Sequence, residues 1–135
     1  MTSVMQKSLR YDKAGVVADL IIQAATVRIN AKRNRLKAEA WRTIYADADG
    51  NMKPLDQVTY SEDDILILFY TMPELIACTT GTITVDGQAV EWQKFDVFCD
   101  LPGELGDLWA DTCREVNPSW YPDLNTGEQE KKILN

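Results

Sequence analysis

The sequence predicts a mainly α-helical fold: one compact domain of four to five helices, with a small β-hairpin at residues 82–92. Helix-start residues precede the apolar stretch 65–70, and apolar side chains recur at helical spacing over residues 101–116. Between two alternating runs stands Asp86-Gly87, a dipeptide typical of two-residue hairpin loops, which would pair Ile83 with Val90. These patterns predict helices around one core, with the hairpin resting on them.

The composition fits one folded domain. The chain has 135 residues, of which 45% are hydrophobic and 26% charged. We expect a helical domain over residues 1–122, with a loose leader at 1–10, and a flexible polar tail at 123–135. No apolar run reaches the ~20 residues of a membrane helix. The three cysteines are interpreted as reduced cytosolic thiols, and no membrane partner is expected.

The chain contains no histidine, which is the commonest general base and metal ligand. We therefore expect no enzymatic activity and no cofactor, although a carboxylate-dependent enzyme remains an alternative. The segment Asp47-Ala-Asp-Gly-Asn51 has residues typical of a calcium loop, but Gly50 stands fourth instead of sixth. We interpret it as a tight turn and expect no metal.

Ser61 is a candidate N-cap for a helix through residues 61–80. Three carboxylates follow it in the first turn, where the helix dipole favours negative charge. A second start signal at Thr71 includes Pro73, so we predict two short helices, or one helix bent at 71–73. Most of this segment is expected to be buried. The alternative is that residues 65–70 form a central strand.

Two helices, or one bent helix, are predicted over residues 12–27 and 30–46. Asp12 is the candidate N-cap of the first, with Tyr11 and Val16 spaced as a hydrophobic staple. The second carries most of the basic side chains, and nucleic-acid binding is not expected because the chain is acidic overall. Residues 1–60 hold ten Lys/Arg against six Asp/Glu, and residues 61–135 hold four against fifteen. This polarity predicts self-association through Arg28, Lys32, Arg33 and Arg35.

A last helix is predicted from Asp100 to Val116, with apolar side chains on one face and carboxylates on another. An apolar patch with two aromatic residues follows before the tail. The predicted partner-binding residues are Trp109, Trp120, Tyr121, Glu104, Asp107, Asp111 and Glu115. The alternative is that the aromatic residues pack in the core and the carboxylates are merely solvated.

Several of these motifs occur in a familiar order. Residues 42–51 include a short Asp-x-Asp-Gly turn, residues 60–65 form the acidic start of a helix, and Met72-Pro73 follows. Together with residues 101–109 and 115–120, this order resembles the tail assembly chaperones of long-tailed, lambda-like bacteriophages.

The resemblance implies a mainly helical, non-enzymatic protein of the host cytoplasm. Such proteins bind the tape measure protein and tail tube subunits during tail assembly, and are absent from the mature virion. Members commonly self-associate and are made in a short and a frameshifted longer form, with which Glu130-Lys131-Lys132 is compatible. The alternative function is a small acidic inhibitor or immunity-type protein that binds a basic partner by charge complementarity.

Overall fold

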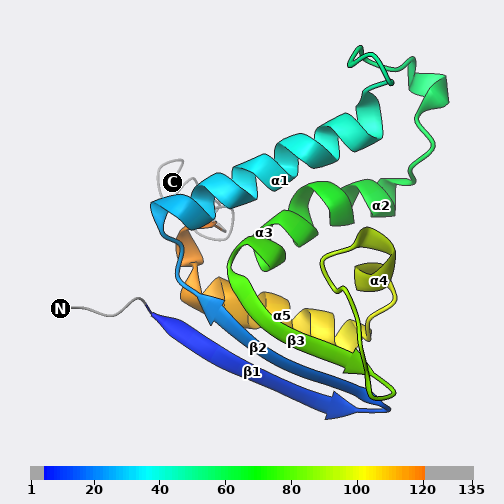
Figure 1. Cartoon of the computed structure of the whole chain (residues 1–135). Helices are drawn as coiled ribbons and strands as arrows, with labels where there is room; N and C mark the ends of the chain where they lie inside the picture. The colour runs from blue at the N-terminus through cyan, green and yellow to red at the C-terminus, as the bar shows by residue number, and fades with distance from the viewer. Residues whose placement is uncertain (1–4, 121–135) are drawn as a thin grey trace, which may run out of the picture.

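The computed structural model describes residues 5–120 as a four-stranded antiparallel sheet with helices packed on one of its faces (Figure 1). The prediction of a mainly α fold was therefore wrong, because the protein is mixed α/β. The strands, in sheet order, are β1 (Gln6–Lys13), β2 (Val16–Gln23), β3 (Thr79–Val85) and β4 (Gln88–Ala89). The helical segments are α1 (Val27–Tyr45), η1 (Leu55–Gln57), α2 (Glu62–Leu66), η2 (Ile67–Thr71), α3 (Met72–Ala77), α4 (Phe95–Cys99), α5 (Gly103–Val116) and η3 (Pro118–Trp120).

The predicted helix over residues 12–27 is instead most of the β1–β2 hairpin. Alternate residues of β2 are buried, beginning at Val16 and ending at Ile22, and this period of two places them on one face of a sheet. Ala14 and Gly15 form the turn with positive φ angles of 53° and 83°, as the loops of tight hairpins require. Asp12 consequently pairs with Val17 across the hairpin and caps no helix.

Most of β1 comes from residues that were expected to be a loose leader. The strand pairs with β2 along its whole length, from Gln6 opposite Gln23 to Lys13 opposite Val16. Leu9 and Tyr11 are buried on the inner face of the sheet. On the outer face, Arg10 lies opposite Asp19 and donates two hydrogen bonds to its carboxylate. The outer face is therefore polar and the inner face apolar.

The Asp86-Gly87 hairpin is confirmed. Its two turn residues have positive φ angles of 50° and 80°, and the Val90 amide donates to the Ile83 carbonyl at 2.9 Å. The hairpin is part of the main sheet, because β3 begins at Thr79 and pairs with β2.

A single uninterrupted helix, α1, replaces the predicted helix at 30–46 and begins three residues earlier. The Thr26 hydroxyl accepts a hydrogen bond from the Ile29 amide at 3.2 Å and caps the helix. Asn30 lies within the first turns of this helix. At the far end, Asp47 accepts backbone N–H groups from Asp49 and Asn51, each at 2.9 Å, and forms the expected tight turn.

The segment after Ser61 is helical, as predicted, and the strand alternative is excluded. The Ser61 hydroxyl accepts from the Asp64 amide at 3.1 Å. Between α2 and α3, η2 is a π-helical segment in which the Met72 amide donates to the Ile67 carbonyl. This wider turn directly precedes Pro73, which has no N–H and would clash with the carbonyl of residue 69 in a regular helix. The predicted irregularity is thus present as a π turn.

Helix α5 lies along β1 and β2, and α3 packs between α1 and α5 (Figure 1). The predicted last helix is confirmed, with its apolar stripe facing the sheet. The largest fully buried side chains include Leu20, Ile22, Leu105 and Trp109, each of which contributes roughly 1.5–3 kcal/mol or more by burial. Within residues 5–120, no helix combines the length and the apolar character that a membrane span requires.

Candidate partner-binding site

The segment Ile65–Tyr70 has an apolar sequence but is not enclosed by the core. Leu66 is 53% exposed and Tyr70 is 51% exposed, and neither α2 nor η2 contains a buried residue. By contrast, α3 is almost entirely buried. The sequence had predicted burial of most of this segment, so this exposed apolar surface is the first indication of a binding site.

An apolar cleft opens on each side of this segment. Leu68 and Met72 line the cleft on one side of the segment, and Ile67 and Thr71 line the cleft on the other. A single π turn within a helix, as at η2, occurs frequently at functional sites. We name the two clefts by the helix that forms their far wall: the α1-side cleft and the α5-side cleft.

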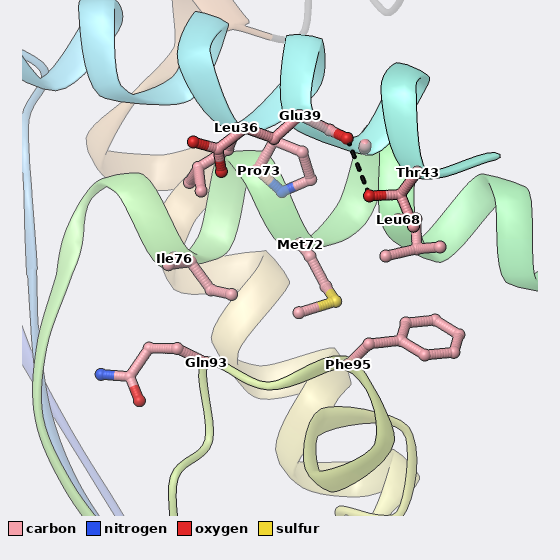
Figure 2. Close-up of a pocket in the computed structure, with 10 residues that line it drawn as sticks. Leu36, Glu39, Thr43, Leu68, Met72, Pro73, Ile76, Gln93 and Phe95 are labelled. Carbon is pink, nitrogen blue, oxygen red and sulfur yellow. Dashed lines mark hydrogen bonds between the residues drawn. The ribbon is translucent and has the colours of Figure 1, made fainter. Parts of the chain in front are cut away.

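The α1-side cleft has a volume of about 210 Å³. Figure 2 shows Met72 and Ile76 pointing from α3 toward the segment that carries Gln93 and Phe95. Leu36 of α1 completes the apolar lining. The Thr43 hydroxyl on the rim donates to the Glu39 carbonyl at 2.9 Å, so this hydroxyl is already hydrogen-bonded within α1. The cleft therefore offers mainly apolar contacts.

The α5-side cleft is larger, with a volume of about 450 Å³. It lies between the η2–α3 segment and the α4–α5 region. Its lining is mostly apolar, as in cavities that bind ligands or partner side chains. A smaller recess, lined in part by Tyr70 and Arg114, shares Thr71, Leu75 and Ala110 with it. The residues that line the main cleft are Ile67, Thr71, Leu75, Phe98, Cys99, Leu101, Pro102, Gly103, Gly106, Asp107, Trp109 and Ala110.

Carboxylates lie near the α4–α5 side of the α5-side cleft. Asp107 lines it directly. The pKa of the Cys99 thiol, which also lines the cleft, is raised first by burial and then by the nearby charges of Asp64, Asp100 and Asp96. We call Asp64, Asp96, Asp100 and Asp107 the acidic rim. Asp96 lies in the first turn of α4 and Asp100 is its C-cap, and the sequence did not predict this helix.

The predicted carboxylate stripe of α5 is divided by the fold. Glu104 pairs with Lys13, and Glu115 pairs with Lys7. Both lysines stand at the ends of β1 on the same face as Leu9 and Tyr11, which places them against α5. The hydrogen bond and charge of Glu104 raise the pKa of Lys13. These two glutamates therefore connect the helix to the sheet.

The other two predicted carboxylates differ from each other. Asp111 accepts a hydrogen bond from Arg114 at 3.2 Å on the exposed face of α5. Asp107 is exposed and belongs to the acidic rim. Of the four carboxylates, Asp107 is therefore the one that the structure places at the cleft.

The aromatic candidates support the alternative of core packing. Trp109 is fully buried, its indole N–H donates to the Thr79 hydroxyl at 2.8 Å, and its ring contacts Trp92 edge-on. Trp120 is buried against α1, where its indole N–H donates to the Asn30 side-chain oxygen at 2.8 Å. Tyr121 lies outside the described residues. Trp109 thus forms part of the wall between core and cleft.

The four basic residues predicted for self-association occupy different environments on α1. Arg28 and Lys32 are exposed, Arg33 stacks on the Trp120 ring at 4.6 Å, and Arg35 pairs with Glu39 at 2.8 Å. The sequence analysis missed Lys37, whose ammonium group lies over the Phe69 and Tyr70 rings at 5.7 and 5.6 Å. Lys37 therefore connects α1 to the exposed apolar segment.

No matching family model, curated protein or solved structure was found in the comparisons. Among the described residues, no group of three or more His, Cys, Asp or Glu side chains is arranged to hold a metal ion. The functional conclusion therefore depends on the geometry of the clefts and the exposed segment between them.

Proposed function

We propose that this protein is a non-enzymatic phage tail assembly chaperone, which binds the tape measure protein and tail tube subunits in the host cytoplasm during tail morphogenesis. The observation that carries the proposal is the half-exposed segment with Leu66 and Tyr70, bordered on both sides by apolar clefts. An exposed apolar helix face of this kind is typical of surfaces that bind another polypeptide. The motif order described for the sequence supplies the particular class.

The physical role follows from the nature of such a partner. A long helical polypeptide with apolar stripes aggregates while its own assembly is incomplete, because its apolar surface remains in contact with water. Apolar surface covered by the chaperone is removed from water, which favours binding. The net charge of −7 favours solubility of the complex. In this proposal the protein leaves before the virion is complete, because the partner then buries the same stripes in the tail.

Association with the product of a long, helix-rich gene just downstream, where the proposal places the tape measure protein, tests this function. We expect the tagged full-length chain to retain that protein in a pull-down at moderate salt. Leu66→Glu places a charge on the exposed segment and should reduce retention about tenfold or more, since a desolvated charge costs several kcal/mol. The control is Leu55→Glu, because Leu55 is even more exposed but lies in η1, away from both clefts.

Equal retention by both variants, or no retention of that protein by the wild-type chain, would contradict the assignment. The acidic rim also favours the second candidate function, a small acidic inhibitor of a basic enzyme. That function replaces the first if the neighbouring gene encodes a basic nuclease or toxin whose activity is lost when the purified protein is added.

A further inference from the structure

We propose that the α5-side cleft binds one face of an amphipathic helix in which Lys and Arg side chains flank an apolar stripe. This inference rests on the proposed function, for which it names the binding site and the chemistry of the partner segment. Three features of the cleft carry the inference: its shape, the charge around it and the open space above Gly106.

The shape of the cleft suits apolar side chains that project from a helix. The main cavity of about 450 Å³ and the recess of about 160 Å³ share residues of α3 and α5, so they lie next to each other along these helices. Ile67, Leu75 and Phe98 provide apolar contacts within it. Helices that dock in grooves insert side chains at i, i+3, i+4 and i+7, and an elongated apolar depression accommodates such a row.

The charge around the cleft selects the flanks of that helix. Asp107 lines the cleft, and Asp100 stands in the chain between two lining residues, Cys99 and Leu101. The charges of the other two carboxylates of the acidic rim are close enough to Cys99 to contribute to the raised pKa of its thiol, after burial. Two cations of this part of the chain are paired with carboxylates: Lys94 with Glu91 at 2.6 Å, and Arg114 with Asp111 at 3.2 Å. A partner with Lys or Arg beside its apolar stripe is therefore attracted, and one with Asp or Glu is repelled.

Neither the second cleft nor a second copy of the chain fits this description as well. The α1-side cleft has less than half the volume, and its far wall is the basic helix. Helix α1 of a second copy has the required charge, but Ala40 and Ile44 of its apolar stripe are buried in its own core. A separate polypeptide is therefore the occupant that we propose.

Gly106 provides a substitution that fills the cleft without disturbing the fold. It lines the cleft on α5, and a Cβ atom added there meets no other atom within 4 Å. Replacing a helical Gly by Gln also favours the helix, by roughly 0.5–1 kcal/mol. Gly106→Gln should therefore fold at least as stably as the wild type while its side chain occupies the cleft. The matched control is Ala38→Gln, at an exposed position of α1.

The test measures fluorescence anisotropy of a labelled peptide of about 18 residues, with Leu at helical spacing and Lys elsewhere. We expect the full-length protein to bind this peptide, to bind it about tenfold more weakly as Gly106→Gln, and to bind it normally as Ala38→Gln. The triple variant Asp96→Asn, Asp100→Asn, Asp107→Asn should also weaken binding and reduce its salt dependence. Asp49→Asn with Asp56→Asn, in the exposed region around η1, serves as the charge control.

Three results would overturn the inference: normal binding by Gly106→Gln, equal binding of a peptide with Glu in place of Lys, or a sedimentation shift to dimers that is lost in Gly106→Gln. The last result would assign the cleft to a second copy. The two proposals are distinguishable, because Gly106→Gln can be used in the pull-down as well. If it retains the helix-rich protein normally, the chaperone function stands and the α5-side cleft is not its site.

Discussion

At the scale of single residues, Asn117 connects the end of α5 to the end of the sheet. It is almost completely buried, its side-chain oxygen accepts from the Ala25 amide at 2.6 Å, and its amide nitrogen donates to the Gln23 carbonyl at 2.9 Å. These backbone groups belong to the last residue of β2 and to the second residue after it. Nothing in the local sequence indicates these distant hydrogen bonds.

We predict that Asn117→Leu lowers the free energy of unfolding by roughly 2–4 kcal/mol, because it leaves two buried backbone groups without hydrogen bonds. Urea denaturation monitored by circular dichroism measures the change. The matched control is Asn34→Leu on the exposed surface of α1, where we expect a change within about 0.5 kcal/mol. Similar losses in both variants would show that the two hydrogen bonds do not stabilise the fold.

At the scale of elements, the predictions that were correct are those for which a few neighbouring residues give a clear cap or turn signal. Ser61 and the Asp86-Gly87 turn each determine their backbone geometry within a few residues, and both were identified correctly. The β1–β2 hairpin was missed because Ala14-Gly15 is a weak turn signal. Its second strand also places Val17, Leu20 and Ile21 at helical spacing, although the alternation from Val16 to Ile22 was equally present.

The same turn gives a prediction. Ala14 has a φ of 53°, a left-handed conformation that is unfavourable for Ala and much better tolerated by Asn. We expect Ala14→Asn to stabilise the protein by roughly 0.5–1 kcal/mol, which raises its melting temperature by a few degrees. In contrast, Ala38→Asn in the exposed middle of α1 should lower it, since Asn is a poorer helix former. A lower melting temperature for Ala14→Asn would contradict the assigned turn.

At the scale of the whole molecule, the paired thiols Cys78 and Cys113 join the α3–β3 junction to α5. Their sulfur atoms are 3.4 Å apart and both side chains are buried. The pKa of the Cys78 thiol is raised above its ordinary value of 9.0. The largest cause is the hydrogen bond with Cys113, and the second largest is burial. The folded state therefore retains a proton that the unfolded chain releases in alkaline solution.

This difference predicts a pH dependence of stability. The stabilisation of the folded state by the protonated Cys78 thiol is fully present below about pH 9. It is lost as the pH rises further, because the unfolded state then binds fewer protons than the native state. The expected slope from one thiol is about 1.4 kcal/mol per pH unit. Denaturation of the reduced protein between about pH 8 and 10.5 should show a steeper decline for wild type than for Cys78→Ala. Parallel declines would contradict the raised pKa.

The sequence by itself determined those features that neighbouring residues control: the position of the helical segment after Ser61, the approximate extent of α1 and α5, and the Asp86-Gly87 turn. It also supplied the unequal distribution of charge. It did not determine which side chains would be exposed, because Leu66 and Tyr70 have the same apolar character as the buried Leu75 and Ile76.

Only the tertiary structure decided the use of each charged and apolar residue. Lys7 and Lys13 neutralise Glu115 and Glu104 because β1 lies against α5, and this pairing leaves Asp107 at the cleft. The clefts themselves arise where the π-helical segment, α1, α4 and α5 meet. Caps and turns are determined within four or five residues of chain, whereas a cleft is formed by segments that are brought together only on folding.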